Sequence, residues 1–252
     1  SVLALATSGT VLYAGLGTTA GDGEVWSCVI ASGCNDWTKI GGDSVNSSWA
    51  VNTFEGVYSL TYFSGNLYAG LGNSANDAEV WRWNGSSWTQ IGGDSLNSGW
   101  TTNFELVYAL INDGTNLYAA LGLTTTDAEV WKWNGTVWTK IGGDGVNSSW
   151  NTDYEYVLSL DYFGTDLYAG LGSTAGDAEV WRFTSGSWTK IGGDDLYSGW
   201  TNVGAYEGVY SLANDGSNLY AGLGATAGDN EVWMWNGSVW AKIGGDGLNS
   251  SF

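Results

Sequence analysis

The chain has 252 residues, of which 26 are acidic and seven are basic, giving a formal net charge of −19 at neutral pH. This charge opposes binding to nucleic acid or to an anionic membrane surface, because both require basic side chains that neutralise phosphates. Hydrophobic residues make up 43% of the sequence and aromatic residues 15%, so the acidity does not indicate disorder. No apolar run of 18 residues and no basic-then-apolar start occurs, so we expect neither membrane insertion nor a signal peptide in this sequence.

A block of about 50 residues recurs five times along the chain, which indicates a fold built from one repeated unit. Each copy contains four short segments rich in aromatic and β-branched residues, separated by Gly, Asn, Asp and Ser. Four antiparallel strands repeated radially are the design of a β-propeller. The sequence therefore predicts an all-β protein with a single domain, a five-bladed β-propeller. Its blades are expected at approximately 1–56, 57–106, 107–156, 157–208 and 209–252.

The first copy begins with a predicted strand at 2–6 and contains both cysteines of the chain. Cys28 and Cys34 lie on either side of an insertion, 29–33, that the other copies lack. We predict a disulfide across this longer hairpin, since the spacing matches no metal or redox motif. Two free thiols in a loop are the alternative. A disulfide would place the protein in an oxidising, extracellular setting.

The second copy shows the four strands most clearly, at 57–63, 66–72, 78–83 and 86–92. The first two strands and the last two are joined by tight turns, and Asn84-Gly85 is a strong hairpin signal. The other two connections are long. In an up-and-down sheet the long connections lie at the same end, so 72–78 and the linking loop at 92–105 should share one face. We expect function on that face.

The 17 tryptophans fall into repeated columns. In the second copy these are Trp81, Trp88 and Trp100. The first two are most simply core residues wedged between blades. Gly70 and Gly72, in the repeated LYAGLG, are interpreted as positions of close strand packing rather than a phosphate loop, since no helix follows them.

The linking loop combines an aromatic side chain with amide, hydroxyl and carboxylate groups, a mixture that can hold a sugar by stacking and hydrogen bonds. In the alternative interpretation Trp100 plugs the groove between blades, while Asp94 and Asn97 shape the turn. The candidate sugar-binding residues are Asp43, Asn46, Trp49, Asp94, Asn97, Trp100, Asp144, Asn147, Trp150, Asp194, Tyr197, Trp200, Asp246 and Asn249.

The chain contains no histidine, so catalytic triads and histidine-ligated zinc are excluded. Chemistry by carboxylates alone, as in glycoside hydrolysis, remains open, although nearly identical carboxylates in every copy do not resemble an asymmetric catalytic pair. One acidic column offers weak candidates for calcium, and these residues could instead accept backbone hydrogen bonds in their own loops. The column consists of Asp22, Asp77, Asp127, Asp177 and Asp229. No cofactor is expected.

The fourth copy departs most from the others. It carries Asp195 and Tyr197 where other copies have Ser or Gly and Asn, and its linking loop is expanded at 201–207. An active site should make one copy differ from the rest, so this loop is the only candidate for an asymmetric site.

The order IGG, then Trp100, then Phe104, then a strand and LYAG resembles the tachylectin family of five-bladed propeller lectins. The resemblance implies a propeller around which related sugar sites recur, sites that recognise N-acetyl amino sugars in that family. The present chain departs from that pattern by its longer linking loop, which contains the insertion GGDSLNS.

Three functions follow from these observations. The first is a secreted, lectin-like protein with up to five equivalent weak sites, which would gain from avidity on a glycan-rich surface. Its ligands should be neutral glycans, because an acidic protein repels sialylated or sulfated ones. The second is an extracellular structural subunit that binds other copies of itself. The third is a glycosidase-like enzyme, which we do not expect.

Overall fold

The computed structural model describes residues 1–17, 23–50, 53–72, 77–101, 104–122, 127–151, 154–172, 178–200, 206–224, 230–245 and 248. In this part of the chain the regular structure consists of β-strands and of 3₁₀ turns of three residues. The predicted all-β class is confirmed. None of the described helical segments is long and apolar enough to span a membrane.

The strands of the first two copies are β1 (Val2–Thr7), β2 (Val11–Leu16), β3 (Glu24–Val29), β4 (Thr38–Gly41), β5 (Gly56–Phe63), β6 (Asn66–Gly72), β7 (Glu79–Trp83) and β8 (Trp88–Gly92). Those of the third and fourth are β9 (Leu106–Asn112), β10 (Leu117–Gly122), β11 (Glu129–Trp133), β12 (Trp138–Gly142), β13 (Tyr156–Phe163), β14 (Asp166–Gly172), β15 (Glu179–Thr184) and β16 (Ser187–Gly192). The fifth copy contributes β17 (Gly208–Asn214), β18 (Leu219–Gly224), β19 (Glu231–Trp235) and β20 (Trp240–Gly244). The 3₁₀ turns are η1 (Ile30–Ser32), η2 (Val45–Ser47), η3 (Leu96–Ser98), η4 (Val146–Ser148) and η5 (Leu196–Ser198).

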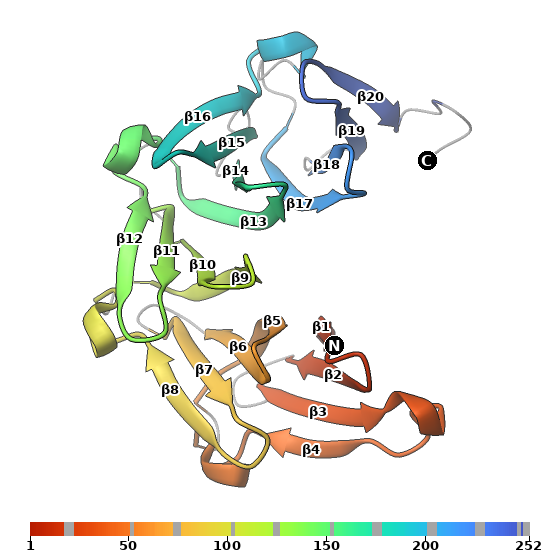
Figure 1. Ribbon diagram of the computed structural model, residues 1–252, viewed down its shortest axis with the longest axis vertical. Helices are drawn as coiled ribbons and strands as arrows, with labels where there is room; N and C mark the ends of the chain where they lie inside the picture. Colours follow the sequence, from red (N-terminus) through yellow and green to blue (C-terminus); the bar gives the residue numbers. More distant parts are fainter. Residues whose placement is uncertain are drawn as a thin grey trace. The chain divides into compact units, whose positions relative to one another are not determined.

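Each copy forms one antiparallel sheet in which consecutive strands are neighbours, as Figure 1 shows for β1 to β4 and for β13 to β16. In the second copy, Leu60 pairs with Ala69 and Ala69 in turn pairs with Trp81. The observed strands of this copy agree with the predicted ranges to within two residues. Their aromatic, leucine and β-branched residues, bounded by Gly, Asn and Ser, account for this agreement.

The chain divides into two compact units. One comprises Ser1–Leu123 with Trp131–Thr139, and the other comprises Thr124–Val130 with Lys140–Phe252. The first unit therefore contains the first two copies and part of the third, and the second unit contains the fourth and fifth copies with the rest of the third.

Small residues allow neighbouring copies to pack closely within each unit. A Cβ atom added to Gly70 would lie 2.6 Å from Cγ1 of Val107 in the next copy. The Ser59 hydroxyl donates a hydrogen bond to the Val107 carbonyl at 3.0 Å, which joins the two sheets at the same point. Ser159 and Val209 repeat this bond at 2.9 Å in the second unit. The interpretation of Gly70 as a close-packing position is thus confirmed.

The second tryptophan column is a set of wedges between copies. The indole of Trp88 is buried, and its Nε1 donates to the carbonyl of Ile40 in the preceding copy at 2.8 Å. Trp138 bonds to Ile91 in the same way at 2.8 Å. Each wedge buries a large apolar area and also satisfies its one polar group, as a buried indole requires. The predicted structural role of this column is confirmed for these residues.

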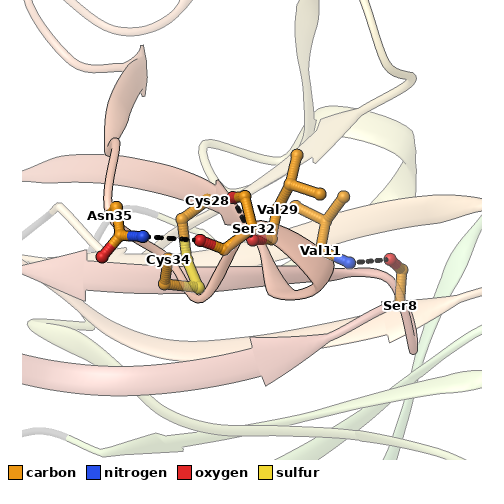
Figure 2. Close-up of a disulfide and its surroundings, with 7 residues drawn as sticks. All are labelled: Ser8, Val11, Cys28, Val29, Ser32, Cys34 and Asn35. Carbon is orange, nitrogen blue, oxygen red and sulfur yellow. Dashed lines mark hydrogen bonds between the residues drawn. A yellow bond between two sulfur atoms is a disulfide. The ribbon is translucent and has the colours of Figure 1, made fainter.

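The predicted disulfide between Cys28 and Cys34 is present, with the two Cα atoms 5.0 Å apart (Figure 2). The inserted residues form η1, which ends at Gly33 in a left-handed conformation with φ of 74°. The Ser32 hydroxyl and the Cys34 amide both donate to the Val29 carbonyl. The insertion is therefore a compact turn closed by the disulfide at the end of β3.

Candidate functional site

The linking loops between copies have a common backbone that reverses the chain directly after the fourth strand. In the second copy, Asp94, Ser95 and Asn97 all have positive φ, between 50° and 62°. Ser95 then donates its amide to the Trp100 carbonyl at 2.7 Å, which closes the loop. Short polar side chains tolerate this left-handed conformation better than other non-glycine residues, which explains the composition of the loop. Sequence patterns did not predict η2 to η5, because three residues cannot show a helical period.

This reversal buries the tryptophan at the end of each described linking loop. Trp100 is 2% exposed, and its Nε1 donates to the Ala78 carbonyl at 2.7 Å. The equivalent bonds, at 2.6 to 2.7 Å, run from Trp49 to Gly23, from Trp150 to Ala128 and from Trp200 to Ala178. The expectation that these four indoles offer a stacking face to a sugar is therefore corrected. They pack between strands, as in the alternative interpretation.

The same bonds place the two long connections of a copy beside each other, as predicted. The Ala78 amide also donates to the Phe104 carbonyl at 3.1 Å, so the end of one connection is attached to the other. The described ends of the two connections therefore meet at the end of the copy that carries the predicted candidates Asp94 and Asn97.

In the first, third and fourth copies the loop aspartate is held by a lysine of the fourth strand. Lys190 donates to Asp194 at 2.6 Å and to Glu179 of the third strand at 2.8 Å. The same arrangement recurs in the first copy, where Lys39 pairs with Asp43 and Glu24. It also recurs in the third copy, where Lys140 pairs with Asp144 and Glu129. Desolvation lowers the pKa of Lys140, but its hydrogen bonds to both carboxylates outweigh that effect and raise the pKa. Three candidate aspartates thus stabilise their own loops.

The second copy lacks this cation, because Gln90 occupies the lysine position. Glu79 accepts a hydrogen bond from Trp81 at 2.6 Å. Burial raises the pKa of Glu79 to about 7, and the charges of Asp94 and Asp77 add to that increase. The second copy is therefore the place where carboxylates gather without a neighbouring lysine on the fourth strand.

The calcium candidates are described only in part. Desolvation raises the pKa of Asp77, and the charge of Asp94 raises it further. Asp127 behaves similarly beside Asp144, with Lys140 opposing the increase. Among the residues that the structure describes, no group of three or more acidic or cysteine side chains is arranged to hold a metal ion. Asp22, Asp177 and Asp229 lie outside the described residues, as do the candidates Asp246 and Asn249.

The loop asparagines turn their side chains back onto the strand. Asn97 donates from Nδ2 to the Ile91 carbonyl at 2.9 Å, and this oxygen also accepts the Trp138 indole. Asn46 and Asn147 make the same bond to Ile40 and Ile141. These side chains are committed to internal hydrogen bonds in all three copies.

Tyr197 occupies the equivalent position in the fourth copy and behaves differently. Its side chain is 48% exposed and lies edge to face with Trp235, with ring centroids 5.5 Å apart. The two rings border a cavity of about 320 Å³ between the linking loop of the fourth copy and the β19–β20 hairpin of the fifth. The cavity is lined by Arg182, Thr189, Ile191, Tyr197, Trp235, Gly237 and Ser238.

Sequence reasoning noticed Tyr197 but missed the rest of this cavity. Arg182 lies on β15 and Trp235 lies on β19, and the two residues are more than 50 positions apart in the sequence. Each has an equivalent in another copy, Arg82 and Trp133, so neither residue stands out in the sequence. The exceptional Tyr197 was the only available signal, and its partners follow from the packing of one copy on the next.

No protein-family model matches the chain, and no curated protein matches it in sequence. Among solved structures it is similar to the GH74 xyloglucanase from Xanthomonas campestris, with 15% identity and a TM-score of 0.61 over 96% of this chain and 38% of that chain. It is also similar to a polysaccharide lyase of family PL25, an ulvan lyase, with 12% identity and a TM-score of 0.57 over 96% and 70%. A prolyl endopeptidase gives 10% identity and a TM-score of 0.58 over 95% and 34%.

At these identities the comparisons show the fold alone, and the neighbours are β-propeller proteins. The chain spans only about a third of the length of the xyloglucanase and of the endopeptidase. None of these neighbours is a tachylectin-like lectin. Because they include enzymes, they give no support to the expectation that the chain is not an enzyme.

Proposed function

We propose that the protein is a carbohydrate-binding propeller that holds neutral sugars without transforming them. The observation that carries this proposal is the cavity beside Tyr197, where two aromatic side chains meet an arginine and two hydroxyl side chains. Sugar rings pack their C–H faces on aromatic groups and offer hydroxyls to polar neighbours. A few polar groups placed around an apolar wall are the usual composition of a small-molecule site.

The size of the cavity suits a short ligand. Its volume of about 320 Å³ is at the lower end of the range for ligand pockets, which begins near ~300 Å³. One or two sugar units would fill such a space, whereas a long chain would extend over the loop surface. A single small site of this kind should bind weakly, because it lacks the avidity that five linked sites would give.

The lining of the cavity favours binding over hydrolysis. Glycoside hydrolysis uses two carboxyl groups on either side of the scissile bond. The seven residues that line the cavity include no aspartate or glutamate. The nearby Glu179 and Asp194 are both paired with Lys190. We therefore propose a non-enzymatic role for this site.

Charge favours neutral ligands. Arg182 is the only charged residue in the lining, and its Nε lies 4.0 Å from a carboxylate oxygen of Asp166. That neighbour offsets part of the positive charge, and the chain as a whole carries −19. Anionic glycans would meet long-range repulsion, while hydroxyl groups can accept hydrogen bonds from the guanidinium.

The disulfide supports an extracellular location. Disulfides persist in oxidising compartments and are rare in the cytosol. Cys28 and Cys34 are paired in a compact hairpin. We propose that the protein is secreted and meets glycans outside the cell.

A glycan array with the fluorescently labelled protein, followed by calorimetry on the glycans that bind, tests this function. The expected result is retention of neutral glycans with dissociation constants in the micromolar to millimolar range. Binding should be unchanged between 0.05 and 0.5 M salt, as non-ionic recognition requires. Absence of binding across the array, or release of reducing sugar from a bound glycan, would contradict the proposal.

A second candidate is a subunit that associates with other copies of itself, and exposed apolar residues of the first copy favour it. Val2 and Leu5 on β1 are 59% and 60% exposed, and Trp37 is 40% exposed. Val2 and Trp37 border a cavity of about 330 Å³ whose lining is almost entirely apolar. Exposed apolar surface of this kind commonly marks a site of contact with another protein chain. Sedimentation velocity at increasing concentration should show oligomers that Leu5→Asp removes, and a monomer throughout would reject this candidate.

A further inference from the structure

We infer that Tyr197 makes the fourth copy the sugar-stacking site of the chain, and that an asparagine at the same position withholds this site from the second copy. This inference rests on the proposed function, because it names the residue that forms the site and the number of sites expected. The sequence suggested up to five equivalent sites. The structure distinguishes one copy by its side-chain geometry.

The backbone is the same in both copies, so the difference lies in the side chain. Tyr197 has φ and ψ of 53° and 40°, and Asn97 has 53° and 39°. Each of the two loops forms a 3₁₀ turn and buries the tryptophan at its end, Trp200 in the fourth copy and Trp100 in the second. An exchange of the two residue types would therefore require no rearrangement of the loop.

The two side chains point to different partners. The Asn97 amide bonds to the Ile91 carbonyl at 2.9 Å and lies back against its own strand. The side chain of tyrosine has no amide group with which to make this bond. In the fourth copy the equivalent carbonyl, that of Ile191, accepts a hydrogen bond from the Trp240 indole at 2.7 Å. The ring of Tyr197 extends outward to Trp235 instead. One substitution thus replaces an internal hydrogen bond by an exposed aromatic wall.

The conformation of Tyr197 argues against a purely structural role. A bulky residue at positive φ is strained, whereas asparagine adopts this region readily. Strained residues of this kind are concentrated at ligand sites. Tyr197 leaves nearly half of its surface in solvent, so burial does not compensate for the strain. Stacking against a sugar ring is a function that asparagine could not perform.

The second copy retains the remaining parts of the site. Arg82 occupies the position of Arg182, and each has a buried Nε with no hydrogen-bond partner among the described residues. Trp133, on the hairpin of the third copy, occupies the position of Trp235 and is likewise buried. At these equivalent positions the second copy therefore differs from the fourth chiefly in the residue at position 97.

This comparison gives a reciprocal experiment. The variants are Tyr197→Asn, Asn97→Tyr and the double exchange, with Tyr197→Phe as a control that keeps the ring. The probes are the methyl glycosides of glucose, galactose and N-acetylglucosamine, with methyl glucuronide as the anionic comparison. Titration calorimetry gives the affinity and the number of sites, and circular dichroism checks the fold.

Wild-type protein should bind a neutral glycoside with one site per chain. Tyr197→Asn should weaken binding at least tenfold with the fold intact, and Tyr197→Phe should retain most of the affinity. Asn97→Tyr should give two sites, and the double exchange should restore one.

The results separate the inference from the function on which it rests. Wild-type binding that Tyr197→Asn leaves unchanged would overturn the inference and leave the function standing. An unaltered number of sites in Asn97→Tyr would overturn the part that concerns the second copy. Failure of wild-type protein to bind any glycoside would contradict both, and a preference for methyl glucuronide would contradict the neutral ligand class.

Discussion

Gln90→Lys should stabilise the protein at neutral and alkaline pH, because it supplies the lysine that the second copy lacks. Lys140 and Lys190 show the expected geometry, in which one ammonium group bridges the glutamate of the third strand and the aspartate of the loop. In the second copy these carboxylates are Glu79 and Asp94. The new lysine should pair with both.

The magnitude follows from the pKa of Glu79, which rises from 4.5 to about 7. At about 1.4 kcal/mol per pH unit, ionising this group costs the native state up to ~3 kcal/mol above pH 7. Partial exposure to solvent reduces this to about 1–2 kcal/mol. Because the native pKa is the higher one, the contribution of Glu79 to the stability of the wild type is greatest below pH 4.5 and falls as pH rises to 7. The lysine should remove this decline.

Urea unfolding followed by tryptophan fluorescence at pH 4.5, 6 and 8 measures the effect. Thr89→Lys is the matched control, because it adds the same charge on an exposed neighbouring position. Gln90→Lys should exceed this control by about 1–2 kcal/mol at pH 8 and by much less at pH 4.5. Equal gains from the two lysines at pH 8, or a gain from Gln90→Lys that does not grow between pH 4.5 and pH 8, would contradict this prediction.

Three further changes test the packing. Replacing Cys28 and Cys34 by serine should lower the free energy of unfolding of the first unit by about 2 kcal/mol, as expected for a short closed loop, and denaturant titration with and without reductant should show this. Trp100→Phe should cost about 1–3 kcal/mol because the Ala78 carbonyl loses its buried donor, and a change below 0.5 kcal/mol would count against that bond. Gly70→Ala should destabilise by about 1–3 kcal/mol, because its Cβ would lie 2.3 Å from Oγ of Ser59. Adding Ser59→Ala should recover part of this loss, since the third copy combines Ala109 with Ala120 at these positions.

The strands were predictable because their signal is local. β5 and β6 are rich in aromatic, leucine and β-branched residues and are separated by Ser64-Gly65, and Asn84-Gly85 marks the turn between β7 and β8. The disulfide was predictable because the insertion between the cysteines is absent from every other copy. These features require no knowledge of how one copy packs on the next.

The burial of Trp100 was not predictable from its neighbours in sequence. The residue types around it are equally compatible with a sugar site and with a turn. The outcome depends on the left-handed residues Asp94 and Asn97, which turn the chain so that the indole returns beneath Gly92. A Cβ at Gly92 would lie 2.9 Å from the Trp100 ring, so the space for the indole is created by a glycine of the preceding strand.

The cavity beside Tyr197 could be suspected from the sequence but not assembled. Tyr197 breaks the asparagine column, which marks the fourth copy as different. Its contact with Trp235 depends on the position of the next copy's hairpin relative to η5. The lysine pairs were missed for a related reason, because Lys190 and Glu179 are brought together by the register of β15 and β16 rather than by sequence spacing.

A crystal structure of the wild-type protein soaked with the methyl glycoside that binds most tightly would show where the sugar lies. We expect one sugar ring in the cavity between the fourth and fifth copies, stacked on Tyr197, with hydroxyl groups within hydrogen-bond distance of Arg182. A sugar bound only elsewhere on the protein, or an empty cavity at saturating glycoside, would contradict this expectation.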